Sequence, residues 1–273
     1  MKILIPTDFS PLSKVAVQYA VALGKKRKAE LVLLSVVSLD SAPGRGILNV
    51  QFLVEKMTEN AAEDCAKLIS EIRSENKETI NITSMVVSGS PVEDVVTDYA
   101  QHNDIDLIVM GTKGATGLKK VVFGSHAAAV INKSDIPVIV VPEFARFTNL
   151  KDVVYATDIA NLKDELKTVV SIAKDFNATV HILHIVSAVG EEKLDKKQTV
   201  AKLTKAMDYK KITFAVSLHD DAAEGIDQYV IEHKPDMLVM FTHELTFFEK
   251  IFGQSVTREM AFLSHVPLLT YKK

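Results

Sequence analysis

The chain carries one sequence pattern twice, and this internal repeat constrains its fold more than any other feature. The segment Lys2-Ile-Leu-Ile-Pro-Thr-Asp8 returns 150 positions later as Asp152-Val-Val-Tyr-Ala-Thr-Asp158. Near the end of each copy the offset falls to 130, since Asp106-Leu-Ile-Val-Met110 corresponds to Asp236-Met-Leu-Val-Met240. The sequence therefore predicts two copies of one domain, the second shorter by about 20 residues in its loops.

Each copy alternates short β-branched runs with amphipathic helical segments, which is typical of a parallel sheet with helices on both faces. The expected strands lie near residues 2–6, 30–37, 80–87, 106–110 and 137–141, and in the second copy near 152–156, 178–186, 211–217, 236–240 and 267–271. The boundary is expected around Phe147-Thr-Asn-Leu150, which gives two α/β domains, 1–147 and 148–273.

Two serine-proline pairs predict helix starts in the first copy. Ser10-Pro11 supplies a serine N-cap and a proline at the first helical position. Ser90-Pro91, with Glu93 following, is expected to repeat this arrangement for the third helix.

Composition argues against several classes of function. The net charge of −3 gives no reason to expect nucleic-acid binding. No apolar segment approaches the roughly 18 residues of a membrane span, and Met1–Pro6 is too short for the core of a signal peptide. We therefore expect a cytoplasmic protein without a membrane partner. Cys65 is the sole cysteine, which rules out an intrachain disulfide and favours a packed side chain over a reactive thiol.

A glycine-rich segment follows the predicted fourth strand of the first copy. Gly111-Thr-Lys-Gly114-Ala-Thr-Gly117 comes directly after Met110, and Gly124-Ser125 follows. Glycines let backbone N–H groups converge without hindrance from Cβ atoms, and a helix starting near Gly124 favours an anion at its N-terminus. Lys113, Thr116 and Ser125 add a mobile charge and two hydroxyl donors. This pattern predicts a phosphate cradle.

Other strand ends of the first copy should lie beside this cradle. Thr7-Asp8, Val36-Val37 and Gly89-Ser90 each follow a predicted strand. Ligands of open α/β sheets collect beyond the carboxyl ends of the strands, so we expect these segments to form one site. Asp8 also has a structural interpretation, because an aspartate after a strand often caps a nearby turn.

These residues resemble a known family. Ile5-Pro-Thr-Asp-Phe-Ser10, together with Gly111-x2-Gly114-x9-Gly124-Ser125, is similar to universal stress proteins of the ATP-binding kind, over nearly the whole chain as two tandem copies. The resemblance implies two open five-stranded parallel sheets of the Rossmann-like, adenine nucleotide α-hydrolase-like type. It also implies an ATP site, with or without Mg²⁺, and a function in the stress response.

The resemblance assigns parts of the nucleotide to parts of the first copy. Asp8 would lie near the ribose and adenine, the backbone near Val37 would recognise adenine, and Lys113 would contact the β- or γ-phosphate. The triphosphate would be held by Gly111, Gly114, Gly124 and Ser125. The residues expected to bind the nucleotide are Pro6, Thr7, Asp8, Val36, Val37, Gly89, Met110, Gly111, Lys113, Gly114, Thr116, Gly117, Gly124, Ser125 and His126.

The second copy departs from this pattern at the cradle. Phe241-Thr-His-Glu244 replaces the first four residues of the glycine-rich segment, and Phe247 stands where Gly117 stood. A glutamate repels phosphate, and a bulky residue is strained where glycine adopts a positive φ. We therefore expect one nucleotide site per chain. Phe247, Phe248, Ile251 and Phe252 either close the vacated pocket, which we favour, or form a lid or partner surface.

Histidines and carboxylates of the second copy offer a competing site. His219, Asp220 and Asp221 follow one predicted strand, and His243-Glu244 follows the next. These side chains could ligate zinc or another divalent ion, but their spacing matches no known metal motif. Solvated loop residues and helix caps are the favoured interpretation, so no metal site is predicted.

Three functions remain open on this sequence. The chain is a nucleotide-binding regulator, an ATP hydrolase or nucleotidyl transferase, or an assembly module with a vestigial site. Against an enzyme, it lacks the Gly-x4-Gly-Lys-Ser/Thr loop and the Gly-x-Ser-x-Gly elbow, and no base or arginine finger accompanies the cradle. The family resemblance also implies that Pro137–Val141 and Pro267–Tyr271 pair, making an intramolecular pseudo-dimer. A further homodimer of the whole chain is left open.

Overall fold

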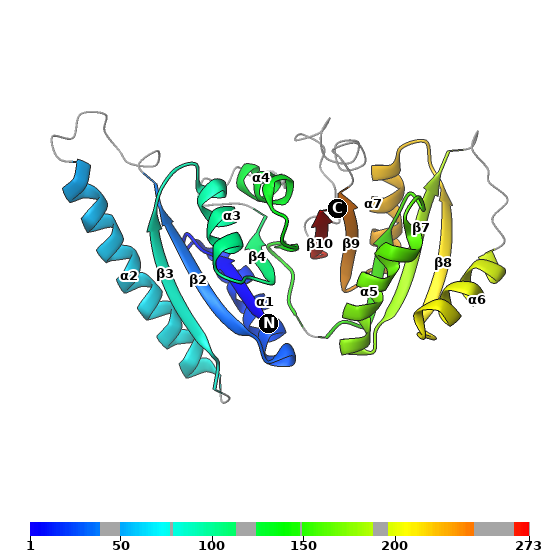
Figure 1. Ribbon diagram of the computed structural model, residues 1–273, viewed down its shortest axis with the longest axis horizontal. Helices are drawn as coiled ribbons and strands as arrows, with labels where there is room; N and C mark the ends of the chain where they lie inside the picture. The colour runs from blue at the N-terminus through cyan, green and yellow to red at the C-terminus, as the bar shows by residue number, and fades with distance from the viewer. Residues whose placement is uncertain are drawn as a thin grey trace. The chain divides into compact units, whose positions relative to one another are not determined.

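The computed structural model describes residues 1–38, 50–76, 79–112, 124–147, 149–187, 196–242 and 265–272 (Figure 1). The described residues divide into two compact units. The first unit ends at Arg146 and the second begins at Phe147. Each unit is an α/β fold, as the repeat predicted.

The first unit is a parallel sheet of five strands in the order β3-β2-β1-β4-β5. Its elements are β1 (Lys2–Pro6), α1 (Pro11–Arg27), β2 (Glu30–Val37), α2 (Val50–Glu75), β3 (Ile82–Ser88), α3 (Val92–His102), β4 (Leu107–Gly111), α4 (Ser125–Lys133) and β5 (Val138–Val141). Helix α1 packs on β1 and β4, α2 packs on β2 and β3, and α3 and α4 pack against each other. The expected strands are confirmed to within two residues at each end.

The second unit repeats this architecture, with strand order β10-β9-β6-β7-β8. Its elements are β6 (Asp152–Ala156), α5 (Leu162–Phe176), β7 (Thr179–Val186), α6 (Lys196–Met207), β8 (Ile212–Leu218), α7 (Ala222–His233), β9 (Met237–Thr242) and β10 (Leu268–Lys272). Strand β6 takes the central place that β1 has in the first unit. The pairing of the two units through their last strands stays a prediction.

The core of each unit is its central strand with the neighbours on either side. Ile3, Leu4 and Ile5 of β1 are fully buried, and Val153 and Tyr155 of β6 are buried to the same degree. Such continuous apolar runs are expected of strands covered by helices on both faces. This burial fixes the strand ends, and the ends carry the polar residues of the candidate site.

One of the two predicted helix starts is confirmed and the other is wrong. Ser10 caps α1, and its Oγ accepts a hydrogen bond of 3.2 Å from the Ser13 backbone N–H. Helix α3 instead begins at Val92, and its N-cap is Pro91, whose ring offers no acceptor. Carboxylates in the first turn of α3, on Glu93 and Asp94, supply the negative charge that a helix N-terminus favours.

Cys65 is buried in the face of α2 that packs on the sheet, as expected of a packed side chain. Burial raises the pKa of its thiol, which lowers the thiolate fraction at neutral pH. Among the helices of the described segments, none is both long and apolar enough to cross a membrane.

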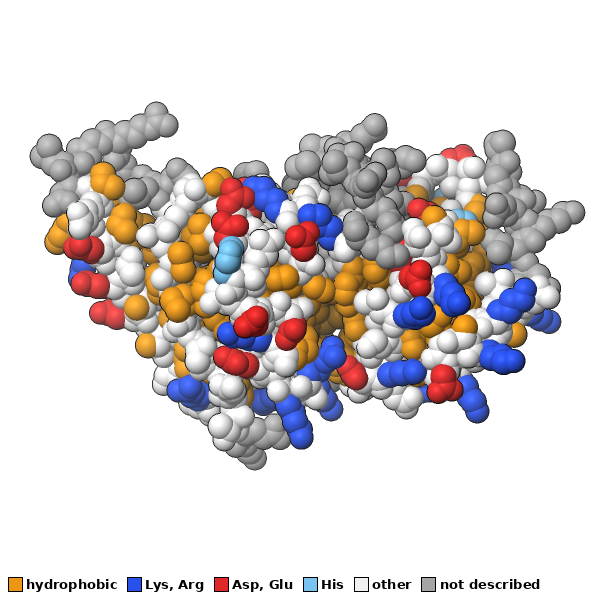
Figure 2. Space-filling model, viewed as in Figure 1, with side chains coloured by type: hydrophobic (Ala, Val, Ile, Leu, Met, Phe, Trp, Pro, Cys, Tyr) orange, Lys and Arg blue, Asp and Glu red, His pale blue; other side chains and the backbone are white. Residues whose placement is uncertain are grey.

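Charge is distributed unevenly over the elements. Figure 2 shows acidic side chains along α2 at the left of this face and basic ones over α6 at the right. Helix α6, with the sequence KKQTVAKLTKAM, contains lysines and no acidic residue. The small net charge of the whole chain therefore conceals local excesses of both signs.

Candidate functional site

Strand order places the candidate site of the first unit at a reversal in the sheet. Strand β1 lies between β2 and β4, with Pro6 paired to Leu34 on one side and Leu4 paired to Ile108 on the other. The chain therefore leaves β1 towards β2 and later returns to its opposite side. Such a switch point is where α/β sheets bind ligands. The residues that follow β1, β2 and β4 share this edge.

Thr7 shapes the turn after β1 from inside the protein. Its backbone N–H donates to Leu34 O at 2.9 Å, and its Oγ1 lies 3.0 Å from Ser13 Oγ. The same Oγ1 accepts a hydrogen bond from the Phe9 backbone N–H at 3.1 Å. These contacts occupy the buried hydroxyl, so Thr7 acts on the site by fixing the position of Asp8.

Asp8 is exposed at the end of this turn. Its Oδ1 accepts a hydrogen bond of 3.1 Å from the Ser10 backbone N–H, which is the turn-capping role considered for it. A carboxylate has about four acceptor positions, so a residue of this type can accept from ligand hydroxyl groups as well as from a backbone N–H. The capping bond holds the carboxylate at the switch point.

The end of β2 is tied to the end of β3. The Val37 carbonyl accepts a hydrogen bond of 3.0 Å from the Gly89 backbone N–H. Val37 is buried, whereas Val36 is partly exposed. A Cβ at Gly89 would lie 2.6 Å from Cγ2 of Val95, so a larger residue there would force the Val95 side chain or α3 to shift.

Backbone contacts bring the start of α4 to the end of β4. Thr112 N–H donates to Val141 O at 3.2 Å, and Gly124 N–H donates to Thr112 O at 2.5 Å. Gly124 is the N-cap of α4 and has no side chain with which to cap it. The first N–H groups of a helix lack intrahelical partners, so Ser125 and His126 begin a helix end suited to an anion.

The expected site residues are thus brought together in part. Residues after β1, β2, β3 and β4 lie at one edge, and Gly124-Ser125-His126 are held to it through Thr112. Met110 is buried within β4. Lys113, Gly114, Thr116 and Gly117 lie outside the described residues.

Sequence reasoning missed Glu93, which links α3 to α4. Its Oε2 lies 3.1 Å from His126 Nδ1, and its Oε1 lies 3.6 Å from Lys133 Nζ. The pKa of the Glu93 carboxyl lies below its usual range. The largest cause is a hydrogen bond with the backbone of Glu93 itself, and the contacts with His126 and Lys133 lower the pKa further, whereas burial acts to raise it. No local pattern could reveal this contact, because it joins residues 33 positions apart on two helices.

The second unit keeps the turn after its central strand. Thr157 N–H donates to Leu183 O at 3.0 Å, and its Oγ1 accepts from Ile159 N–H at 3.0 Å. Asp158 Oδ1 accepts a hydrogen bond of 3.0 Å from Ala160 N–H. These contacts match those of Thr7 and Asp8, so the shared Thr-Asp pair builds the same turn in both units.

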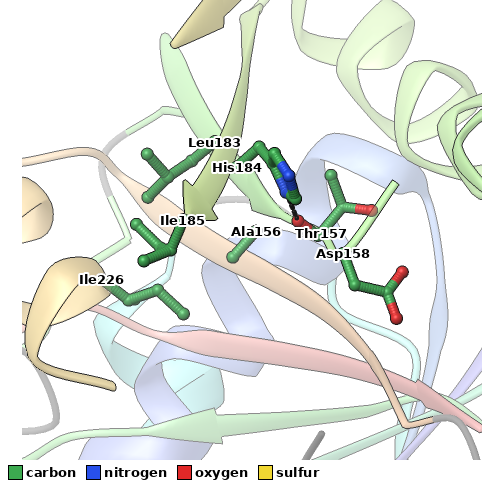
Figure 3. A pocket seen from close by; sticks show the side chains of 7 residues that line it. All are labelled: Ala156, Thr157, Asp158, Leu183, His184, Ile185 and Ile226. Carbon is green, nitrogen blue, oxygen red and sulfur yellow. Dashed lines mark hydrogen bonds between the residues drawn. The ribbon is translucent and has the colours of Figure 1, made fainter. Parts of the chain in front are cut away.

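A small cavity lies at this edge of the second unit (Figure 3). It measures about 60 Å³ and is lined by Ala156, Thr157, Asp158, Leu183, His184, Ile185 and Ile226. The His184 ring is held against the backbone, because its Nδ1 lies 2.9 Å from Thr157 O.

Aromatic and acidic residues fill the interior behind this turn. Tyr155 stands where the first unit has Ile5, and its hydroxyl donates to the buried carboxylate of Glu165. Burial, together with Glu165, raises the pKa of Tyr155. Phe241 occupies the position of Gly111. Its ring packs edge-on to Tyr155, with ring centroids 5.8 Å apart, and stacks on Tyr271, with centroids 5.1 Å apart. The phenylalanine that replaces glycine at this position is therefore part of the core of the second unit.

One of the residues considered for a metal site, Asp221, has a structural role. Asp221 caps α7, with its Oδ1 accepting from Ala223 N–H at 2.8 Å and from Glu224 N–H at 3.1 Å. His243 and Glu244 lie outside the described residues. Within the described segments no group of three or more His, Cys, Asp or Glu side chains is placed to hold a metal ion.

The fold and the repeated turn agree with the comparisons to known proteins. The sequence model of the universal stress protein family matches residues 1–142 and again 150–272. The chain therefore belongs to the universal stress protein family and contains two copies of its domain.

Relatives of known sequence match about half of the chain. Universal stress protein MJ0531 of Methanocaldococcus jannaschii is 31% identical over 140 residues, which cover 51% of this chain and 81% of that protein. MJ0577 of the same organism is 30% identical over 152 residues, covering 51% of this chain and 93% of that protein.

A solved structure matches the chain almost from end to end. The crystal structure of a universal stress protein from Archaeoglobus fulgidus has a TM-score of 0.77 and 20% sequence identity. The match covers 99% of this chain and 98% of that one. At 20% sequence identity, this structural similarity establishes the fold alone.

Proposed function

We propose that this protein binds ATP in its first domain, with Mg²⁺, and acts as a nucleotide-dependent regulator in the stress response. The proposal assigns residues 1–147 to a nucleotide-binding domain and 148–273 to a divergent domain without a nucleotide. The observation that carries it is the hydrogen bond from Gly124 N–H to Thr112 O. That bond sets an uncapped helix N-terminus beside the switch point of the sheet.

The base and ribose would lie over the ends of β1 and β2. Asp8 is exposed there and held by its bond to Ser10 N–H, which suits a carboxylate that accepts from ribose hydroxyls. The backbone at the end of β2, near Val37, would recognise adenine through its N–H and C=O groups. These assignments agree with the family resemblance of the Pro-Thr-Asp segment.

The triphosphate would occupy the space between β4 and α4. Gly111 ends β4, and the Gly124 N–H is bonded to Thr112 O, so the N–H groups offered to phosphate are those of the first turn of α4, from Ser125 onward. Gly114, Gly117 and the Lys113 ammonium complete the cradle in this proposal. Backbone N–H groups and one mobile cation are the partners that phosphate oxygens favour.

Where the second domain is described, it differs from the first at the positions proposed to hold the nucleotide. Phe241 fills the position of Gly111 with a buried ring, and the cavity at Asp158 holds about 60 Å³. The Glu244 carboxylate at the position of Gly114 would also repel phosphate. One nucleotide per chain is therefore the expected stoichiometry.

Calorimetric titration of ATP with Mg²⁺ into the whole chain tests this proposal, once the protein is shown to be free of co-purified nucleotide. We expect one site per chain, lost in Gly114→Glu, which copies the second domain. The matched control is Gly253→Glu, which places the same charge in the second domain and should leave affinity unchanged. Absence of heat with the wild type, or two sites per chain, would contradict the proposal. Phosphate release in the same samples measures any turnover.

A further inference from the structure

Glu93 connects two helices that begin at the proposed nucleotide site. Helix α3 starts just after Gly89, and α4 starts at Ser125. The Glu93 side chain is 18% exposed, and its Oε2 lies 3.1 Å from Nδ1 of His126, which is 56% exposed. His126 is the second residue of α4, so its ring is anchored at the helix end that would face the phosphates.

This contact decides which nitrogen of His126 carries a proton. Glu93 is ionised at neutral pH, because its hydrogen bonds and the nearby cations lower its pKa. An ionised carboxylate accepts hydrogen bonds and donates none, so Nδ1 must be the donor. In neutral imidazole the other nitrogen, Nε2, then has a lone pair and cannot donate to a phosphate oxygen. The imidazolium form donates from both nitrogens.

We propose that the His126 side chain binds the nucleotide's phosphates as an imidazolium, that Glu93 positions its ring, and that ATP binding takes up a proton. The inference rests on the proposed function and adds to it a phosphate-binding side chain and a positioning residue. No bond is made or broken. A proton moves from solvent to Nε2 of His126 as the phosphate arrives, and it leaves again when the nucleotide dissociates.

The charged surroundings of His126 support this coupling. Helix α4 packs on α3 and β5, and β5 has no ionisable side chain. Lys133 Nζ, two turns along α4, lies 2.5 Å from Asp94 Oδ1 and 3.6 Å from Glu93 Oε1, so two carboxylates share this cation. Farther along α3, His102 Nδ1 bonds the Asp98 carbonyl at 2.7 Å. Among the described residues, Glu93 is the ionised group that contacts His126.

Proton uptake can be measured by titrating MgATP into the full chain at pH 7.5 in two buffers of different ionisation enthalpy. We expect the wild type to take up about half a proton more per ATP than His126→Gln does. The ligand's own proton exchange cancels in this difference. The control is His102→Gln, which removes an exposed histidine elsewhere and should match the wild type.

A second variant separates the positioning role from a purely structural one. Glu93→Gln keeps the size of the side chain but releases the Nδ1 proton, so neutral His126 can donate from Nε2. We expect it to bind ATP with much less proton uptake. In the wild type alone, affinity should be about five- to tenfold tighter at pH 6 than at pH 8, which tests the coupling even if a variant misfolds.

The outcomes distinguish this inference from the proposed function. Binding with equal proton exchange in the wild type and His126→Gln, or affinity independent of pH, would overturn the inference and leave the ATP site standing. No binding of ATP by the wild type would overturn both. Uptake lost in His126→Gln and reduced in Glu93→Gln supports it.

Discussion

At the residue scale, side-chain packing alone gives a reason for a glycine at position 89, without reference to a ligand. A Cβ added there would lie 2.6 Å from Val95 Cγ2, against about 3.5–4.0 Å for carbons in contact. Because Gly89 N–H also donates to Val37 O, a shift at Gly89 would move the strand end proposed to recognise adenine. One glycine thus couples the packing of α3 to the shape of the site.

Gly89→Ala should therefore destabilise the first domain by about 1–3 kcal/mol, because the added methyl group displaces α3. ATP affinity should fall as well. Urea unfolding followed by circular dichroism and ATP calorimetry measure the two effects. The double variant Gly89→Ala with Val95→Ala removes the clash and should recover most of both losses. A single variant as stable as the wild type would show that α3 yields easily at this point.

At the element scale, the two domains share the same turn after the central strand but use different buried contacts between that strand and the next helix. In the first domain Thr7 pairs with Ser13, which ties β1 to α1 through two hydroxyl groups. In the second domain Tyr155 of β6 donates to Glu165 of α5, and both side chains are buried. A buried carboxylate needs its donors, so the β6–α5 contact depends on this tyrosine more than β1–α1 depends on a single hydroxyl.

Tyr155→Phe should lower the stability of the second domain by about 1–3 kcal/mol, since Glu165 loses a donor. The raised pKa of Tyr155 also gives the direction in which the stability of the second domain changes with pH. Its stabilising effect is complete below about pH 10, the ordinary tyrosine pKa, and is lost as pH rises above it. Hydrogen exchange in peptides covering β6 and α5, at pH 7.5 and pH 10.5, measures both effects.

The control for this prediction is Glu165→Gln, which keeps an acceptor for the tyrosine hydroxyl and should cost less at pH 7.5. Comparison of Tyr155→Phe with the wild type isolates this group from the other residues that titrate in alkali. Equal protection of β6 in the variant and the wild type at pH 7.5 would contradict the prediction.

At the scale of the whole molecule, the sequence predicted the features that depend on local pattern. Strands such as β1 and β4 were located because buried parallel strands are continuous apolar runs. The start of α3 was misplaced by one residue, because Ser90-Pro91 has the pattern of an N-cap and first helical residue, whereas Pro91 is itself the N-cap. The Glu93–His126 and Tyr155–Glu165 contacts were not foreseen, because helix packing sets which side chains meet.

The asymmetry of the repeat is also a property of the whole chain. The first domain has glycine where β4 ends, while the second has Phe241 packed between Tyr155 and Tyr271. An aromatic core at this position packs the interior of the second domain where the first has no side chain. The Thr-Asp turn is thus shared by two domains whose residues at the end of the fourth strand differ.

The predicted pairing of the two domains through residues 137–141 and 267–271 can be tested by hydrogen exchange at single amides. Within its own domain, β5 pairs with β4 along one edge. Alternate N–H groups of an edge strand point away from its neighbour and exchange quickly unless another strand accepts them. We expect slow exchange at successive amides of β5 and β10, because each strand would then be paired on both edges. Fast exchange at every second amide, in a chain whose other strands are protected, would show that the domains do not pair in this way.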